Sequence, residues 1–412
     1  MMVRLLLIGI FAVVKAASAA QPMNPPGLMP TAIARPLFEQ DPGVAAARAG
    51  LDVALQEASI LDQSPYEWTA RVDGQQRRVE NGPRYNEWFV GVEKTIRLPG
   101  KATADRSIGK ATVDESRARY GEALLTSARE LMELWVDWLA AERARELGGS
   151  SLQSMQASLA AVEKRARAGD ASKLDLGITR AELAEQRRMD NDAKTQAAAA
   201  WLRLSTRFPG VERQLLALPE PLVLGSEAPS WQERILAETH ALKLVQAQVR
   251  KAQAQAERAR AEKIPDPTFG VYTASEIGGR ERIPGVTISI PIPGGARDLR
   301  SAQAIAAVEV SRQEAELKQR QLQAGIASAV ATARGGYESF QIANEGAAAM
   351  QENARLMQRA YALGEAELQA FLLTRRQATA AVNNALQAQV IALKAYYGLL
   401  IDAHLIWGLE HD

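Results

Sequence analysis

Residues capable of metal or acid–base chemistry are sparse in this chain of 412 residues. It contains no cysteine and three histidines, of which two lie near the C-terminus beside carboxylates, a ligand mixture that divalent metal ions accept. The histidines are His240, His404 and His411, and the neighbouring acids are Asp402, Glu410 and Asp412. We interpret the C-terminal group as a solvated tail rather than as a metal site. Without cysteine, a thiolate metal site and a disulfide are both excluded.

No other pattern of reactive residues is present. The sequence has no nucleophile elbow, phosphate-binding loop, HExxH motif or cofactor fingerprint. Asp and Glu are dispersed as on charged helix faces, so we predict that the protein is not an enzyme and uses no cofactor. The 49 basic and 48 acidic residues are interspersed, with a net charge of +1. No basic stripe is interleaved with aromatic residues, which argues against nucleic-acid binding.

The most informative feature is a large internal duplication. An alternating strand ends at a Pro-Gly corner and enters a long helical pattern twice, at residues 91–100 and 285–294. The first glycines (285 − 91) and the prolines Pro99 and Pro293 (293 − 99) are both 194 positions apart. A duplication of this size sets the architecture. Together with a preceding strand in each copy, the alternation of apolar with small or polar residues predicts strands at about 66–79, 85–98, 267–275 and 284–292.

Each corner opens into a helix of unusual length. The helical pattern runs from Pro99 to about Ala168 and from Pro293 to about Leu363. At ~1.5 Å per residue such helices are on the order of 100 Å long, whereas globular helices average about 11–12 residues. We therefore expect them to pack side by side, with local bends or thin packing at the glycine pairs 148–149 and 335–336.

The long helices turn at a second duplicated corner. Residues 169–180 match residues 364–375 at an offset of 195 (364 − 169), with Gly, Ala, Thr and Arg identical at corresponding positions. A glycine followed by an acidic or hydroxyl residue is typical of a tight helix–helix turn. Return helices are predicted to about Thr206 and Leu405. Each repeat therefore reads helix, strand, strand, long helix, turn, helix.

The N-terminus is typical of a secretory signal. It has Arg4, an apolar run at residues 5–14 and small residues for cleavage after Ala19 or Ala20. No later segment has the run of about 18 apolar residues that a transmembrane helix needs. We predict a signal peptide (1–20), an extended N-terminal arm (21–35), a first repeat (36–207), a linker (208–231), a second repeat (232–407) and a C-terminal tail (408–412).

In the order and spacing of these features, the chain resembles the TolC-like outer-membrane efflux channel family over essentially the whole mature sequence. The resemblance rests on the two duplicated corners and on Tyr361, just before the second glycine turn. It implies a mostly α fold with a transmembrane β part. Three protomers would each give four strands to a 12-stranded outer-membrane β-barrel, and their helices would form a long periplasmic α-helical barrel. A trimer also meets a physical requirement, because open strand edges are not tolerated in lipid.

By the same resemblance the glycine turns are the periplasmic tips, where family members close the pore and meet an adaptor. The candidate tip and gate residues are Gly169, Asp170, Asp175, Tyr361, Gly364, Glu365 and Glu367. At the second tip, Ala370 and Leu373 stand where the best-known members have two acidic residues, and Ala366 stands where they have an arginine.

Two interpretations of the tip acids remain open. A threefold ring of Asp175 or Glu367 would attract cations into the pore entrance. The same acids would also stabilise the starts of the return helices. We hypothesise that Asp175, Tyr361 and Glu367 make contacts between protomers that hold the pore closed.

The Leu-Pro-Gly-Lys corner and the general sequence character are most similar to the heavy-metal cation-efflux branch, of the cobalt-zinc-cadmium type. The resemblance implies a passive exit duct of a tripartite pump, in the outer membrane with its helical part in the periplasm. The implied partners are two further copies in a homotrimer, a periplasmic membrane-fusion adaptor, an inner-membrane RND-type transporter and outer-membrane lipid. Two alternatives are a periplasmic coiled-coil adaptor or structural protein, and an efflux channel for drugs or organic compounds rather than metals.

Overall fold

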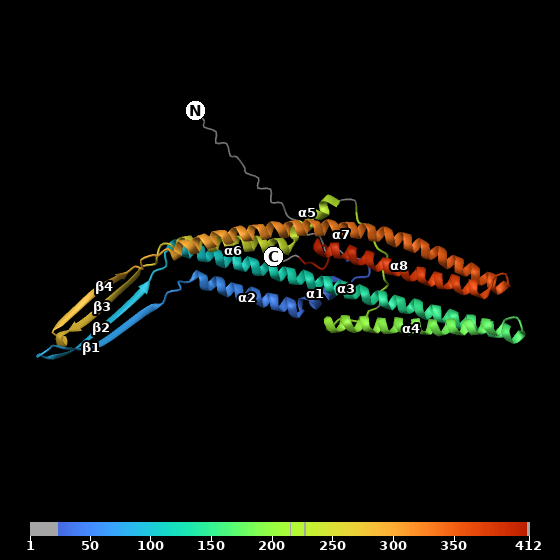
Figure 1. Cartoon of the computed structure of the whole chain (residues 1–412), viewed down its shortest axis with the longest axis horizontal. Helices are drawn as coiled ribbons and strands as arrows, with labels where there is room; N and C mark the ends of the chain where they lie inside the picture. The colour runs from blue at the N-terminus through green and yellow to red at the C-terminus, as the bar shows by residue number, and fades with distance from the viewer. Residues whose placement is uncertain (1–23, 215, 226–227, 410–412) are drawn as a thin grey trace, which may run out of the picture.

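The computed structural model describes residues 24–214, 216–225 and 228–409, so the predicted signal peptide (1–20) lies outside the described residues. The protein is an elongated rod with a sheet at one end and two helix–helix turns at the other (Figure 1). The elements are α1 (Thr31–Glu39), α2 (Pro42–Asp62), β1 (Trp68–Arg78), β2 (Arg84–Thr95), α3 (Pro99–Ala168), α4 (Lys173–Arg207), α5 (Ala228–Glu238), α6 (His240–Ala261), β3 (Thr268–Glu276), a 3-10 turn (Ile277–Gly279), β4 (Glu281–Ser289), α7 (Ala296–Leu363) and α8 (Leu368–Asp402). The predicted duplication is confirmed, because α2–β1–β2–α3–α4 recurs as α6–β3–β4–α7–α8.

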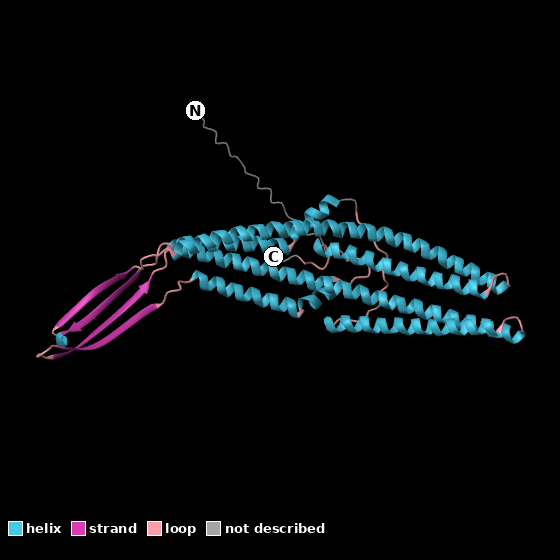
Figure 2. Cartoon of the chain, viewed as in Figure 1, coloured by secondary structure: helices cyan, strands magenta, loops and turns pink. Residues whose placement is uncertain are grey.

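The four strands form one antiparallel sheet in the order β1-β2-β3-β4, to which each repeat gives a hairpin (Figure 2). β2 ends at Thr95 and β4 at Ser289, three residues before the predicted ends (98 − 95 and 292 − 289). The chain leaves the ladder there to reach the Pro-Gly corner. Within the described chain, β1 and β4 each keep one edge without a strand neighbour.

The sheet has two chemically distinct faces, because residues directly opposite each other across strands share a face. One face carries large apolar side chains that are exposed: Trp68, Val72, Trp88, Val90, Val92, Phe269, Val271, Val286 and Ile288. On the other face, Arg77 pairs with Glu87 at 3.1 Å and with Glu276 at 3.2 Å. An exposed apolar face that spans all four strands indicates a surface meant to be covered.

The long helices are continuous. α3 spans 70 residues and α7 spans 68, and both run through their glycine pairs without a break. Gly336 marks a close helix contact instead, since a Cβ there would lie 3.3 Å from Cα of Ala392 on α8. No helix among the described residues combines the length and hydropathy needed to cross a bilayer.

The main apolar core lies midway along the rod, where α1, α3, α4 and α8 meet. Trp135 and Trp138 of α3 are at most 1% exposed. Trp135 donates from Nε1 to the carbonyl oxygen of Gly27 at 2.8 Å. Phe38 of α1 faces Trp407, with ring centroids 6.1 Å apart. The segment before the first repeat and the C-terminal end of the second repeat therefore both contribute to this core.

The N-terminal arm is not extended throughout, contrary to the prediction for residues 21–35. α1 begins at Thr31, and its apolar residues are buried against the core. The first helix of the repeat also starts later than Pro36. Asp41 caps α2 by accepting from the backbone N–H of Gly43 at 2.7 Å and of Val44 at 3.3 Å.

The prediction of a solvated C-terminal tail is wrong over the described residues. His404 is buried, and its ring stacks on that of His240 with centroids 5.3 Å apart. Asp402 forms an ion pair with Arg129 of α3. Burial of the apolar residues that follow, Trp407 above all, draws this segment into the core. Residues 410–412, including His411, lie outside the described part of the chain.

Candidate functional site

Both glycine turns lie at the end of the rod that is far from the sheet, with the same backbone geometry (Figure 1). Gly169 and Gly364 have φ of 87° and 79°, a left-handed conformation that glycine adopts without steric cost. Asp170 N–H donates to the carbonyl of Arg165 at 2.8 Å, and Glu365 N–H donates to that of Ala360 at 2.9 Å. These bonds satisfy carbonyls at the helix ends. The structure thus brings all seven predicted tip residues to one end of the molecule.

The two turns differ in how the return helix is capped. Ser172 begins α4 with a capping box, in which its hydroxyl accepts from Asp175 N–H and the Asp175 carboxylate accepts from Ser172 N–H, both at 3.0 Å. Glu367 holds the corresponding position before α8 and makes no such side-chain bond. Asp175 therefore stabilises a helix start, whereas the exposed Glu367 carboxylate is not used as a cap.

Tyr361 packs inside the tip and connects the two hairpins. Its ring stacks on Phe371 of α8, with centroids 5.3 Å apart and planes 3° from parallel. The guanidinium of Arg165, from α3 of the other hairpin, lies 5.0 Å from the Tyr361 ring centroid. A small apolar cluster drawn from both hairpins surrounds this stack: Met155, Val162, Leu183, Leu368, Phe371 and Leu372.

Two arginines near the start of α8 tie the second hairpin to the first. Arg375 donates to the carbonyl oxygen of Ser151 at 2.7 Å and to the hydroxyl of Ser158 at 3.2 Å, both on α3. Arg376 pairs with Glu182 of α4 at 2.9 Å. Burial lowers the pKa of Arg375, and the charge of Glu182 opposes that shift. Neither arginine was predicted as a site residue from the sequence, although Arg375 closes the duplicated turn motif.

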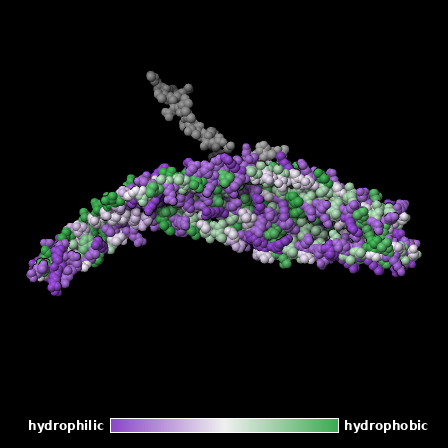
Figure 3. Space-filling view, in the orientation of Figure 1, coloured by the Kyte–Doolittle hydropathy of each residue, from purple (hydrophilic) through white to green (hydrophobic). Residues whose placement is uncertain are grey.

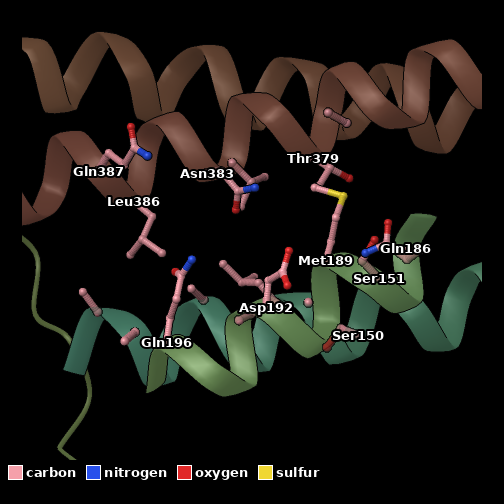
Figure 4. A pocket seen from close by; sticks show the side chains of 18 of the residues that line it. Ser150, Ser151, Gln186, Met189, Asp192, Gln196, Thr379, Asn383, Leu386 and Gln387 are labelled. Carbon is pink, nitrogen blue, oxygen red and sulfur yellow. The ribbon is translucent and has the colours of Figure 1, made fainter. Parts of the chain in front are cut away.

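On the sheet side of these links, the hairpins enclose a groove of about 1210 Å³. Side chains from α4 and α8 face each other across it (Figure 4). The labelled lining residues are Gln186, Met189, Asp192 and Gln196 of α4, Ser150 and Ser151 of α3, and Thr379, Asn383, Leu386 and Gln387 of α8. Amide, hydroxyl and charged side chains are mixed with aliphatic ones in this lining, which suits contact with an amphipathic helix. Across the described ranges, no group of three or more His, Cys, Asp or Glu residues could hold a metal ion.

At the opposite end of α3, buried charges join the helices to the sheet. Lys101 Nζ lies 3.0 Å from Asp266 Oδ2, and the two side chains are 1% and 3% exposed. Asp266 also accepts from Leu98 N–H at 3.0 Å and from the Tyr66 hydroxyl at 2.7 Å. Burial and the neighbouring Asp266 carboxylate raise the pKa of Tyr66 to about 12. We call Tyr66, Arg97, Lys101, Asp105, Arg258, Glu262 and Asp266 the junction network.

The rest of the junction network centres on Asp105. This carboxylate lies 3.0 Å from Arg97 and 2.7 Å from Arg258 of the second repeat. Arg97 also donates to the carbonyl oxygens of Leu61 at 2.8 Å and Asp62 at 2.7 Å, where α2 ends. Both repeats therefore contribute charges to a single connection between the sheet and the helical rod.

The sequence pattern of the family described as Outer membrane efflux protein matches residues 35–207 and 231–399. These two segments cover most of the chain and coincide with its two structural repeats.

The chain belongs to the outer membrane efflux protein family.

Solved structures of outer membrane channels share its fold. The chain is similar to CusC (TM-score 0.70, 18% identity, covering 89% of this chain and 92% of CusC). It is also similar to VceC of Vibrio cholerae (TM-score 0.73, 13% identity, 90% and 95% covered). The open-state MtrE channel of Neisseria gonorrhoeae gives a TM-score of 0.66 at 16% identity, with 93% and 90% covered. The TolC-like resemblance is confirmed.

Among sequence relatives, the chain is similar to protein CyaE of Bordetella pertussis, at 28% identity over 270 residues. The aligned region covers 62% of this chain and 56% of CyaE. The outer membrane efflux family is one of channels rather than of enzymes, which agrees with the lack of catalytic motifs.

Proposed function

We propose that this protein is the outer-membrane channel of a tripartite efflux pump, a passive exit duct formed by a homotrimer. The sheet carries this proposal. Its apolar face is exposed over all four strands, its opposite face holds ion pairs, and β1 and β4 have unpaired edges. Lipid would cover the first face and water the second, and open edges must be paired in lipid. Three copies supply 12 strands, enough to close around an aqueous lumen.

The helical rod would extend from this barrel into the periplasm, with the glycine turns as its gated end. A small apolar cluster and a few directional bonds from Arg375 and Arg376 hold the hairpins together there, so opening would break few contacts. We propose that Asp175, Tyr361 and Glu367 add contacts between protomers that keep the pore closed. Glu367 suits this role, since its exposed carboxylate is not used within its own turn.

The proposed partners are a periplasmic membrane-fusion adaptor and an inner-membrane RND-type transporter, which would supply selection and energy. The groove between α4 and α8 gives an adaptor helix a surface of mixed polarity. We propose heavy-metal cations as the cargo, on the resemblance of the Leu-Pro-Gly-Lys corner to that branch and on the acids at the tip. A duct needs no coordinating ligands, so a channel for drugs or organic compounds is the second candidate.

Conductance tests the channel. Detergent-purified protein would be reconstituted in a planar bilayer, with its mass determined alongside. A trimer that gives stable, small, cation-preferring currents supports the proposal. A monomer that stays soluble without detergent and carries no current would establish the periplasmic coiled-coil alternative.

Cargo is tested separately in cells. A strain that lacks the gene should become sensitive to cobalt, zinc or cadmium salts, and the intact gene should restore growth. Sensitivity confined to drugs or solvents would assign the channel to organic compounds. Arg48→Gln, at an exposed position of α2 that does not line the groove, gives a neutral control in the same assay.

A further inference from the structure

Three arginines stand on the apolar face of the sheet, at the end of the strands far from the helices. Arg282 lies opposite Ser275, and Ser275 lies opposite Trp88, so all three share the apolar face. Arg84 is four residues before Trp88 on β2 and therefore points to the same side. Arg78 of β1 lies directly opposite Arg84. All three arginines are exposed, and this end of the molecule is hydrophilic in Figure 3.

Among the described residues, these arginines have no acidic partner, unlike their neighbour Arg77 on the other face. Arg77 is held by Glu87 at 3.1 Å and Glu276 at 3.2 Å. No carboxylate of the described chain forms an ion pair with Arg78, Arg84 or Arg282. Like charges directly opposite each other across two strands destabilise the pair. The sheet therefore places an uncompensated positive charge where only an external anion can neutralise it.

The place of the three arginines at the border of the apolar face indicates which kind of anion they bind. Next toward the helices comes a neutral polar pair, in which Gln76 Nε2 donates to Asn86 Oδ1 at 3.1 Å. The exposed valines and aromatic residues of the apolar face follow, and Lys94 stands at the other end of the same face, above the ring of Trp68. An apolar band bordered by guanidinium groups matches a lipid whose acyl chains end at phosphate, which arginine binds in a bidentate manner.

We propose that Arg78, Arg84 and Arg282 bind the phosphate groups of a phosphorylated glycolipid of the outer leaflet, of the lipid A type. The inference rests on the proposed function, because it requires the apolar face to be in the outer membrane with the strand loops outward. The lipid would neutralise the facing arginines and fix the depth at which the sheet sits in the bilayer.

The test uses the purified full-length trimer with three probes: bisphosphorylated lipid A, the same lipid without its phosphates, and inorganic phosphate. The triple variant Arg78→Gln/Arg84→Gln/Arg282→Gln is compared with wild type by native mass spectrometry and by thermal stability with added lipid. Wild type should bind bisphosphorylated lipid A best, and inorganic phosphate should not compete. The triple variant should lose at least about tenfold in affinity, as expected for charge-assisted hydrogen bonds.

The matched control removes three exposed helix arginines that also form no ion pair within the described part of the chain, Arg48→Gln/Arg187→Gln/Arg334→Gln. It should bind lipid A like wild type. Equal affinity of wild type for both lipids, effective competition by inorganic phosphate, or an equal loss in the control would overturn the proposal. Wild-type conductance in a bilayer without lipid A is measured in parallel, so that a failed channel is distinguished from a failed lipid site. If the triple variant does not assemble, two measurements decide: the lipid A affinity of the single variant Arg282→Gln, and the preference of wild type for the phosphorylated lipid over the lipid without phosphates.

Discussion

The two repeats share one topology but differ in how they satisfy their charges at the tip. In the first, Arg180 of α4 pairs with Glu163 of α3 inside its own hairpin, at 3.2 Å. Its counterpart Arg375 (180 + 195) finds Gln358 where the first repeat has Glu163 (163 + 195). Arg375 therefore turns to the first hairpin and donates to the carbonyl of Ser151. The loss of one carboxylate converts an internal ion pair into a link between hairpins.

The same contrast recurs where the helices meet the sheet. Lys101 and Asp105 of the first repeat are buried in the junction network. Their counterparts at an offset of 194 are Gly295 and Leu299, and Leu299 is 73% exposed. Nearby Ile292 is 95% exposed. At the start of α3 the first repeat is thus packed within the protomer. At the start of α7 the second repeat exposes apolar side chains, which a neighbouring copy would cover.

The largest expected effect comes from the buried charge that only the first repeat possesses. Lys101→Met leaves Asp266 buried without its cation, which should lower the free energy of unfolding by about 3–5 kcal/mol. Denaturant unfolding of the purified protein measures this change. Lys110→Met, an exposed position on the same helix, should change little. Equal effects at both positions would show that the buried ion pair does not hold the junction.

The next effect concerns the link between hairpins. Arg375→Ala removes two hydrogen bonds of a charged donor, each worth about 1.5–3 kcal/mol, and should shift the tip toward the open state by about tenfold or more. Resting single-channel conductance should rise accordingly. Arg180→Ala removes the matching ion pair within the first hairpin and should leave resting conductance near wild type. A higher conductance in Arg180→Ala than in Arg375→Ala would reverse the assignment.

Acid should weaken the junction network through Asp266. Burial alone would raise the pKa of Asp266, but hydrogen bonds from Leu98 N–H and the Tyr66 hydroxyl and the positive charge of Lys101 outweigh it and hold that pKa below its usual value. A carboxylate with a depressed pKa in the folded state stabilises fully above its unfolded value, and this stability disappears as pH falls through the folded pKa. Thermal stability should therefore drop below about pH 4. Asp266→Asn should be less stable at neutral pH and show a flatter acid limb; an unchanged limb would contradict this account.

The smallest effect distinguishes the two helix caps. Ser172→Ala breaks the capping box of α4 and should cost about 0.5–2 kcal/mol. At the corresponding N-cap position of the other repeat, Glu367→Ser should add a cap and stabilise α8 by about 1 kcal/mol or less. Hydrogen exchange of the first-turn amides, read hairpin by hairpin, measures both. A loss of protection in Glu367→Ser would show that the Glu367 carboxylate already supports its helix.

Local patterns account for what the sequence predicted correctly. The alternation around Val286 and Ile288 and the glycines at 169 and 364 define strands and turns through neighbours only a few residues away. The break before α2 also had a local signal, since Asp41 precedes Pro42 at the first helical position. The gate role of the seven tip residues stays a prediction, as do the contacts of Asp175, Tyr361 and Glu367 between protomers.

The missed features depend on contacts between distant residues. Lys101 finds Asp266 across 165 positions (266 − 101), and Arg375 finds Ser151 across 224. Neither pairing is encoded by spacing. The solvated tail was wrong for the same reason, because His404 is buried against the ring of His240, 164 positions away (404 − 240). Charged residues that look alike along a helix are separated into solvent, core and interface only by the fold.

The unpaired edges of β1 and β4 carry a consequence for how the protein is made. In the proposed homotrimer, the sheet of each chain is completed only by other copies. Formation of the finished channel is then a multimolecular reaction, whose rate rises steeply with the local concentration of chains. Until it occurs, each copy exposes two strand edges that can pair with any extended polypeptide. A low local concentration of unassembled chains would favour their degradation, and a high one would favour aggregation. A periplasmic chaperone that holds unassembled chains would widen the range of concentrations at which assembly succeeds.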